Sequence, residues 1–259
     1  MNNKLGNISF NFKDCAAIVS GGYRGIGKCT VDMLVASGAR VYTIDPKFPS
    51  TLFEKNILKF KGYTNIENDL NEFMDRIISN ENHVNFLVNN AGIYFYKYID
   101  DCTVDDFNRI VNANMNGMFN MTKKFLPMLK NSKDAAIVNV ASVSGQRPEM
   151  GHPLYSMTKG AILALTKALA ADLGKYSIRV NSVSPGNIST PMNNADILEQ
   201  SKMRKLDTQV IEREYAEESI LKRRGVPNEV SSVILFLLSN GAGYINGTDI
   251  IIDGGLYLI

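Results

Sequence analysis

Histidine and cysteine are scarce in this chain, with two of the former and three of the latter among 259 residues. The histidines are His83 and His152, and no Cys-x-x-Cys pair occurs among Cys15, Cys29 and Cys102. A metal site of imidazole and thiolate ligands, or a disulfide framework, needs a denser set. We therefore expect no metal cofactor, and free thiols are typical of a reducing cytoplasm.

Long apolar runs are also missing. The longest purely aliphatic or aromatic run extends from Val233 to Leu238, whereas a membrane-spanning helix needs about 20 apolar residues. The stretch from Met1 to Lys13 is polar and lacks the apolar core of an export signal. We expect a cytoplasmic protein that is neither exported nor anchored to a membrane.

No charge of one sign dominates, because the formal net charge is +2 with 21% charged residues. The one compact basic run, Lys222-Arg223-Arg224, stands ahead of Gly225 and Pro227, where cations suit the last turn of a helix. We therefore expect no nucleic-acid partner. No composition break or flexible linker divides the chain, so residues 1–259 are predicted to form one domain.

Short apolar runs alternate with helical patterns along the chain. The predicted strands are Ala16 to Val19, Arg40 to Ile44, Ile57 to Phe60, Phe86 to Val88, Ala136 to Val140, Arg179 to Val183 and Asp249 to Ile252. The predicted helices lie near Gly25 to Ser37, Leu70 to Ser79, Val104 to Leu129, Tyr155 to Leu173 and Pro227 to Leu238. This alternation predicts an α/β fold with a doubly wound, mostly parallel, seven-stranded sheet and helices on both faces. Ligands of such sheets bind beyond the carboxyl ends of the strands.

A glycine-rich turn, Ser20-Gly21-Gly22-Tyr23-Arg24-Gly25-Ile26-Gly27, follows the first predicted strand and opens a helix. Backbone N–H groups at such a helix start can hold a diphosphate, although glycines also make ordinary turns. Asp45 ends the second strand at the place where an acid meets the adenosine ribose of a dinucleotide. Its alternative interpretation is a solvated Asp before Pro46.

Asp45 also bears on the choice between NAD and NADP. A 2′-phosphate within about 4 Å of this carboxylate would cost roughly 4 kcal/mol at an effective dielectric constant of 20. Arg24 and Lys47 argue the other way, because both can pair with a phosphate. Both cations are long and can swing into water, so we expect NAD as the cofactor, with NADP as the alternative.

Ser142, Tyr155 and Lys159 form a candidate proton-transfer group. Tyr155 and Lys159 are four residues apart and share a helix face. A free tyrosine has a pKa near 10, so a base role near neutral pH needs the nearby lysine charge. Ser142 can hydrogen-bond a substrate oxygen while charge develops there. The alternative is an ordinary surface pair of Tyr155 and Lys159.

At this point the chain resembles the short-chain dehydrogenase/reductase family, which has a Rossmann fold, over nearly its whole length. The residues that carry the resemblance are the glycine-rich turn, Asn89-Asn90-Ala91-Gly92, Asn114, Ser142, Tyr155-Ser156-Met157-Thr158-Lys159, Pro185 to Thr190 and Asp253-Gly254-Gly255. The resemblance implies a three-layer Rossmann domain with Asn114, Ser142, Tyr155 and Lys159 as catalytic residues. It further implies that Asn114 orders a water that links Lys159 to solvent.

The same resemblance implies a set of cofactor-binding residues. These are Ser20, Gly21, Arg24, Gly25, Ile26, Gly27, Asp45, Asn89, Ala91, Gly92, Tyr155, Lys159, Pro185, Gly186, Ile188 and Thr190. One element departs from the family, because Gly62-Tyr63-Thr64 stands where an Asp-Val pair usually meets adenine, and Asp69 lies too far on. Tyr63 is either a surface residue or a stacking partner for adenine.

The sequence says less about the substrate than about the cofactor or the catalytic residues. Tyr94, Phe95, Tyr96 and Tyr98 follow the Asn-Asn-Ala-Gly turn. Met150, His152 and Met192 lie on segments that the resemblance places around the pocket. They suggest an apolar, adaptable wall, with simple packing as the alternative. His152 is interpreted as a residue of the pocket wall or the surface, because Tyr155 already has the base role.

The function expected from these features is NAD(H)-dependent interconversion of a secondary alcohol and a ketone of the sugar or polyol, hydroxysteroid or hydroxy acid class. The alternatives are an NADPH-dependent 3-oxoacyl-type carbonyl reductase and a nucleotide-sensing regulator without turnover. The charged stretch 187–224 is predicted to form short amphipathic helices that act as a substrate lid. Apolar residues beyond one helical stripe, such as Leu163, Leu165 and Leu169, together with the resemblance, favour a homotetramer or homodimer.

Overall fold

The computed structural model describes residues 8–258, so the first seven residues of the polar leader lie outside it. Within this range the strands are β1 (Ala16–Ser20), β2 (Arg40–Ile44), β3 (Leu52–Glu54), β4 (Ile57–Phe60), β5 (Phe86–Asn89), β6 (Ala136–Val140), β7 (Arg179–Pro185) and β8 (Asp249–Ile252). They form one sheet in the order β3-β4-β2-β1-β5-β6-β7-β8. Every neighbouring pair is parallel except β3 with β4. The chain order reverses beside β1, where doubly wound sheets bind ligands.

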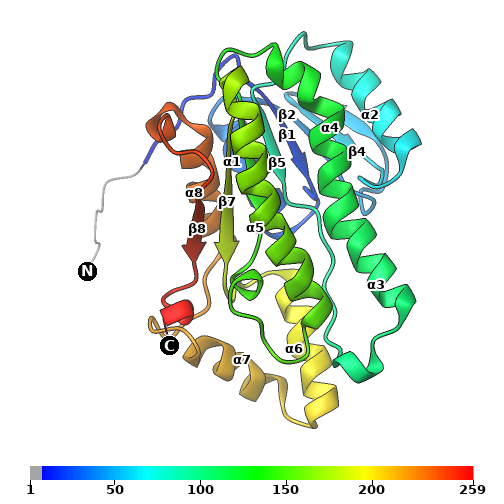
Figure 1. Cartoon of the computed structure of the whole chain (residues 1–259), viewed down its shortest axis with the longest axis vertical. Coiled ribbons are helices and arrows are strands. Elements are labelled where there is room, and N and C mark those ends of the chain that lie inside the picture. Colours follow the sequence, from blue (N-terminus) through cyan, green and yellow to red (C-terminus); the bar gives the residue numbers. More distant parts are fainter. Residues whose placement is uncertain (1–7, 259) are drawn as a thin grey trace.

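Helices cover both faces of this sheet (Figure 1). The α-helices are α1 (Gly25–Ala36), α2 (Glu67–Ile78), α3 (Val104–Val111), α4 (Gly117–Lys130), α5 (Pro153–Leu173), α6 (Pro191–Arg204), α7 (Thr208–Glu217) and α8 (Pro227–Leu238). One core cluster joins the sheet to α2, α4 and α5, and a second joins it to α1 and α8. In β1, Ile18 belongs to the first cluster and Val19 to the second, as the alternation of side chains along a strand requires. The result is the predicted three-layer α/β fold.

The seven predicted strands are all present, with an eighth in addition. The antiparallel β3 was not predicted, because its three residues are exposed and are too few to show an alternating pattern. The single helix predicted from Val104 to Leu129 is divided by a π-helical turn at Asn112–Asn116. A π turn changes the hydrogen-bond spacing without a change in composition, so the apolar periodicity does not reveal it.

Helices α6 and α7 lie beyond the carboxyl ends of β7 and β8, below the arrowheads in Figure 1. They occupy most of the charged stretch 187–224 and pack against each other through Ile197, Ile211 and Tyr215. Thr190 begins α6 as a cap, since its Oγ1 accepts the N–H of Asn193 at 3.2 Å. None of the helices in the described range is long and apolar enough to cross a membrane.

Candidate active site

The glycine-rich turn between β1 and α1 leaves its helix start open. Gly21 has φ +74°, a backbone conformation that favours glycine. A Cβ on Gly27 would lie 2.1 Å from the Gly21 carbonyl oxygen, so this close approach also requires glycine. The N-cap residue Arg24 makes no side-chain cap, and the first turn of α1 holds no acid. The first N–H groups of α1 are therefore available to an anion.

The end of β1 is tied to the loop after β5 by hydrogen bonds. Ser20 Oγ accepts the N–H groups of Asn90 and Ala91, each at 3.0 Å. The Asn90 side chain donates in return to the carbonyls of Ser20 and Gly21 at 3.0 Å. Asn89 points away from this loop into the core, where it donates to Thr122 and Asn139. These bonds hold the glycine turn and the Asn-Asn-Ala-Gly loop as one rigid floor.

Asp45 is buried at the end of β2 with both carboxylate oxygens held by backbone. One oxygen accepts the N–H of Tyr23 at 3.2 Å and the other accepts the N–H of Lys47 at 2.9 Å. The acid is therefore oriented toward the glycine turn rather than solvated, although the bond from Lys47 is the local turn expected before Pro46. Arg24 and Lys47 line the same cavity as Asp45.

The segment after β4 reaches the same cavity through Tyr63, Thr64 and Asn65. Tyr63 is half-exposed, so it is both a surface residue and a cavity residue. Asp69 does not line the cavity, and instead its carboxylate accepts the N–H of Tyr63 at 2.7 Å. Asp69 thus fixes the backbone of the loop that stands in place of the family's Asp-Val pair.

Ser142, Tyr155 and Lys159 meet at the carboxyl ends of β6 and β7. Ser142 follows β6, and its hydroxyl donates to the Pro185 carbonyl at 3.5 Å. Tyr155 and Lys159 lie one turn apart on α5, and Lys159 Nζ stands 5.5 Å from the centroid of the Tyr155 ring. Lys159 Nζ also donates to the Val140 carbonyl at 2.8 Å, which fixes its position at the end of β6.

Burial changes the pKa of both groups on α5. It raises the pKa of Tyr155 to about 12, while a hydrogen bond with Ser142 acts in the opposite direction and the charges of Glu149 and Asp196 raise it further. Burial lowers the pKa of Lys159 to about 8. Lys159 is therefore charged at neutral pH, next to a phenol that is protonated.

Asn114 lies behind this group, in the π-helical turn between α3 and α4. It is fully buried, and its side chain is occupied by the chain itself. Its Oδ1 accepts the N–H of Ile93 at 2.7 Å, and its Nδ2 donates to the Ile93 carbonyl at 3.0 Å and to Thr158 at 3.1 Å. The Asn114 amide thus anchors the loop after β5.

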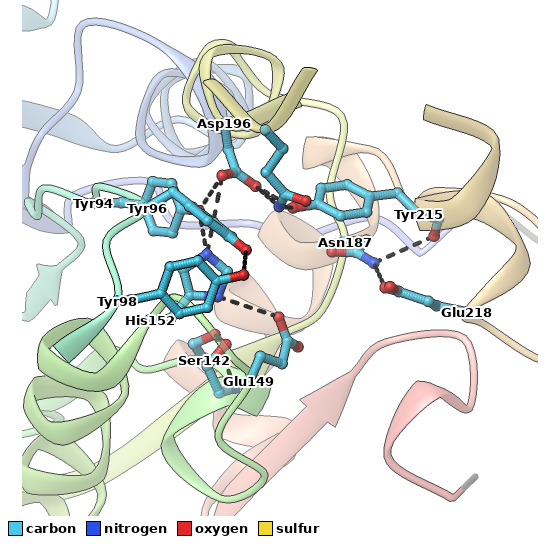
Figure 2. Close-up of polar contacts among 12 residues, drawn as sticks. Tyr94, Tyr96, Tyr98, Ser142, Glu149, His152, Asn187, Asp196, Tyr215 and Glu218 are labelled. Carbon is cyan, nitrogen blue, oxygen red and sulfur yellow. Dashed lines mark hydrogen bonds and ion pairs between the residues drawn. The ribbon is translucent and has the colours of Figure 1, made fainter. Parts of the chain in front are cut away.

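A mostly buried cluster of polar side chains joins the loop after β5 and the start of α5 to α6 and α7 (Figure 2). We call Tyr94, His152, Asp196 and Tyr215 the tyrosine–aspartate cluster. Both tyrosine hydroxyls donate to the Asp196 carboxylate, and Tyr94 also contacts His152 Nε2. The Tyr94 ring meets the Tyr155 ring edge-on at 5.3 Å. The expected apolar wall thus includes, on this side of the site, a buried carboxylate and an imidazole.

A single cavity of about 740 Å³ connects the glycine turn with the tyrosine–aspartate cluster. The predicted residues that line it are Gly21, Arg24, Gly25, Ile26, Asp45, Ala91, Gly92, Tyr94, Ser142, His152, Tyr155, Lys159, Pro185, Gly186, Ile188, Thr190 and Met192. Ser20, Gly27, Asn89 and Asn114 do not line the cavity and support it from beneath. Met150 is 85% exposed and is not brought to the cavity at all.

Several cavity residues were missed at the level of sequence, among them Asn90, Glu149, Asp196, Glu199 and Tyr215. Asn90 could have been found, because it belongs to the Asn-Asn-Ala-Gly motif. Asp196 had no local signal, because its partner Tyr94 is 102 residues away in the sequence.

Known proteins resemble this chain along its length. A family model described as enoyl-(acyl carrier protein) reductase matches residues 21–257. The cyclopentanol dehydrogenase of Comamonas sp. (strain NCIMB 9872) is 32% identical over 253 residues, which cover 93% of this chain and 96% of that protein. The ligand-free aldohexose dehydrogenase of Thermoplasma acidophilum superposes with a TM-score of 0.88 at 28% identity, over 96% of both chains. The 3-ketoacyl-(acyl-carrier-protein) reductase of Brucella melitensis complexed with NADH has a TM-score of 0.85 at 25% identity, over 95% of this chain and 100% of the other.

Proposed function

Because the chain belongs to the short-chain dehydrogenase/reductase family of NAD(P)-dependent oxidoreductases, we propose that it interconverts a secondary alcohol and a ketone with NAD(H). The observation that carries this proposal is the single cavity that joins the open helix start of α1 to Ser142, Tyr155 and Lys159. A dinucleotide that spans this cavity would have its diphosphate at one end and the proton-transfer group at the other.

The residues present fit such a dinucleotide. The uncapped start of α1 and the close approach at Gly27 leave backbone N–H groups free for the diphosphate. Asp45, held by two backbone N–H groups, presents a carboxylate to the ribose hydroxyls. When bound, the cofactor supplies the acceptor or donor of a hydride.

Proton transfer falls to Tyr155, with Ser142 and Lys159 as its partners. In alcohol oxidation Tyr155 takes the proton of the substrate hydroxyl, and in ketone reduction it returns that proton to the carbonyl oxygen. Ser142, which hydrogen-bonds Tyr155, holds the same oxygen. The Lys159 charge favours the phenolate form, which burial alone disfavours.

The preference for NAD over NADP rests on Asp45. Its carboxylate is buried and fixed, whereas Arg24 and Lys47 are flexible side chains at the same end of the cavity. The relative from Brucella melitensis is described as a complex with NADH, which supports the same choice. An NADPH-dependent 3-oxoacyl-type reductase is the second candidate, favoured by the two cations.

Enzyme assays with each cofactor distinguish these candidates. Nicotinamide absorbance should change when the protein and NAD are given secondary alcohols, and less with NADP. A preference for NADPH and 3-oxoacyl thioesters would favour the second candidate, and reduction of enoyl thioesters alone would contradict both. A nucleotide-sensing regulator would bind NADH in a fluorescence titration and turn over none of these compounds.

The proposal includes a lid role for stretch 187–224. Helices α6 and α7 are joined by an ion pair of Arg204 with Glu214 at 2.6 Å, and Arg224 pairs with Glu212 at 2.8 Å. A unit held together in this way can move over the cavity as one piece. NADH, and NADH with product, should slow amide exchange in residues 190–222. Equal protection with and without ligands would favour a permanently docked segment.

The proposal also includes a homotetramer or homodimer. Of the residues on α5 that suggested an interface, Leu163, Leu165 and Leu169 are partly buried in the chain's own core. Phe107 on α3 and Phe119 on α4 are exposed and provide a better reason. Light scattering at micromolar concentration should show an oligomer, and a monomer would contradict this part of the proposal.

A further inference from the structure

The tyrosine–aspartate cluster has a defined pattern of hydrogen-bond donors and acceptors. Asp196 is 4% exposed, and each of its oxygens accepts one tyrosine hydroxyl. Gln200 adds a bond to the carboxylate at 3.3 Å and one to the Tyr215 hydroxyl at 2.5 Å. A tyrosine that has given its one proton to Asp196 can only accept further hydrogen bonds. Burial and the Asp196 charge raise the pKa of both tyrosines, so both keep that proton.

His152 is fixed by the same pattern. Tyr94 donates its hydroxyl hydrogen to Asp196, so its oxygen can only accept from His152. His152 Nε2 therefore carries a hydrogen and donates it to the Tyr94 oxygen. The other ring nitrogen, Nδ1, lies 3.6 Å from a carboxylate oxygen of Glu149. The imidazole is held between the Tyr94 and Tyr96 rings, with centroids at 5.0 and 5.1 Å. With α6 and α7 packed as they are in this structure, these contacts order a polar wall of the cavity, with Glu149 at its edge (Figure 2).

Three carboxylates are among the residues that line the substrate side of the cavity. Glu149, Asp196 and Glu199 line it there, from the segment before α5 and from α6. The cationic lining residues in the described range come from other elements: Arg24 and Lys47 flank Asp45, Lys159 is bonded to Val140, and Arg109 lies over the Phe95 ring. An anionic substrate would meet like charges on this side. A substrate with hydroxyls beyond the reacting one can donate hydrogen bonds to the Glu149 and Glu199 carboxylates.

Resting on the proposed function, we propose that this side of the cavity selects an uncharged polyhydroxylated alcohol or ketone, a polyol or sugar. Glu149 and Glu199 accept hydrogen bonds from its hydroxyls, and Tyr94 and Tyr215, which donate to Asp196, form the wall that such a substrate contacts. Asp196 is a positioning residue, since its oxygens are already occupied by the two tyrosines. Oxidation removes one C–H hydride to NAD and one O–H proton to Tyr155, so the remaining hydroxyls serve recognition alone.

A substrate panel tests this selection. The parent enzyme with NAD is assayed with neutral polyols (ribitol, xylitol, glucitol), with cyclopentanol and cyclohexanol, and with the anions 3-hydroxybutyrate and 3-hydroxybutyryl-CoA. We expect kcat/KM for the best polyol to exceed that of the cycloalkanols by at least about 10-fold and that of the anions by about 100-fold. A preference for cycloalkanols or for the anions overturns the inference and leaves the proposed oxidoreductase function intact. No turnover in any class overturns both.

Substitution of Asp196 separates positioning from general stability. Asp196→Asn keeps the volume but offers one acceptor for two tyrosine hydroxyls. It should lower kcat/KM for the best polyol by about 10- to 100-fold more than kcat/KM for cyclopentanol, because the loss of the Asp196 charge acts on Tyr155 equally with both substrates. Glu217→Gln, an exposed acid on α7 outside the cavity, is the matched control and should change neither. An equal loss with both substrates would indicate a merely structural role and overturn the assignment.

A binding measurement tests the same substrate selection without turnover. The Tyr155→Phe variant with NADH is titrated calorimetrically with glucitol and with cyclopentanol. Binding of glucitol that is weakened by adding Asp196→Asn supports the wall as a polyol site. Binding of cyclopentanol alone contradicts it.

Discussion

Replacing Lys159 by Met should shift the pH dependence of alcohol oxidation toward higher pH. Lys159 Nζ lies 5.5 Å from the Tyr155 ring centroid, and Lys159 is buried while Tyr155 is partly buried. If the ring centroid is taken as the position of the phenolate charge, a unit charge at this distance stabilises the phenolate by about 3 kcal/mol at an effective dielectric constant of 20. At about 1.4 kcal/mol per pKa unit, this corresponds to about 2 units in the pKa of Tyr155.

The sign follows from the protonation state that each direction needs. Oxidation needs the Tyr155 phenolate, so its kcat/KM rises with pH through the pKa of that group. Without the Lys159 charge the pKa rises, and the rising limb should move up by about 2 units. Burial lowers the pKa of Lys159 itself to about 8, so the difference from the parent should be largest below that pH and smaller above it.

The assay is the pH profile of kcat/KM for alcohol oxidation with saturating NAD. NADH affinity is measured separately by fluorescence, because Lys159 is also expected to contact the cofactor. Lys167→Met, an exposed lysine two turns further along α5, is the matched control and should leave the profile unchanged. A Lys159→Met profile with the parental limb would refute the electrostatic role of this lysine.

Three further substitutions test other parts of the site. Tyr155→Phe should lower kcat by about 10²- to 10⁴-fold with NADH affinity little changed, since only the acid is lost; activity within tenfold of the parent would remove Tyr155 from this role. Asp45→Ala should lower the ratio of kcat/KM with NAD to that with NADP by at least about tenfold, because both the hydroxyl acceptor and the repulsion disappear; a parent enzyme that prefers NADPH would contradict the choice of cofactor. Gly27→Ala places a Cβ 2.1 Å from the Gly21 oxygen, so thermal unfolding should show a loss of about 1–3 kcal/mol and NADH should bind more weakly; an unchanged melting temperature would show that the glycine turn can yield.

Local patterns were sufficient for most of the secondary structure. The strands Arg40–Ile44 and Ala136–Val140 and the helix Pro227–Leu238 have the bounds that their apolar runs and flanking residues predict. Such elements are buried on a defined face, so their periodicity records their environment. The edge strand β3 has no buried face, and its pairing with β4 left no pattern in the sequence.

The residues of the candidate site likewise fall into those that the sequence predicted and those that only the tertiary structure placed. The glycine-rich turn and the pair of Tyr155 and Lys159 depend on close spacing along one turn or one helix, so residue order alone determined where to look for a dinucleotide and a proton donor. Whether a residue touches the cavity or supports it depends on the packing of distant strands, and only the tertiary structure placed Asn89 in the core and Asn114 against Ile93.

The character of the substrate wall was decided by the tertiary structure alone. Tyr94 and His152 are aromatic residues with one polar end each, and their sequence neighbours do not specify what that end meets. The fold brings Asp196 from α6 to both, across 102 residues in the case of Tyr94. A buried hydroxyl or imidazole takes its function from the partner that satisfies it, and that partner is supplied by whichever remote segment packs against it.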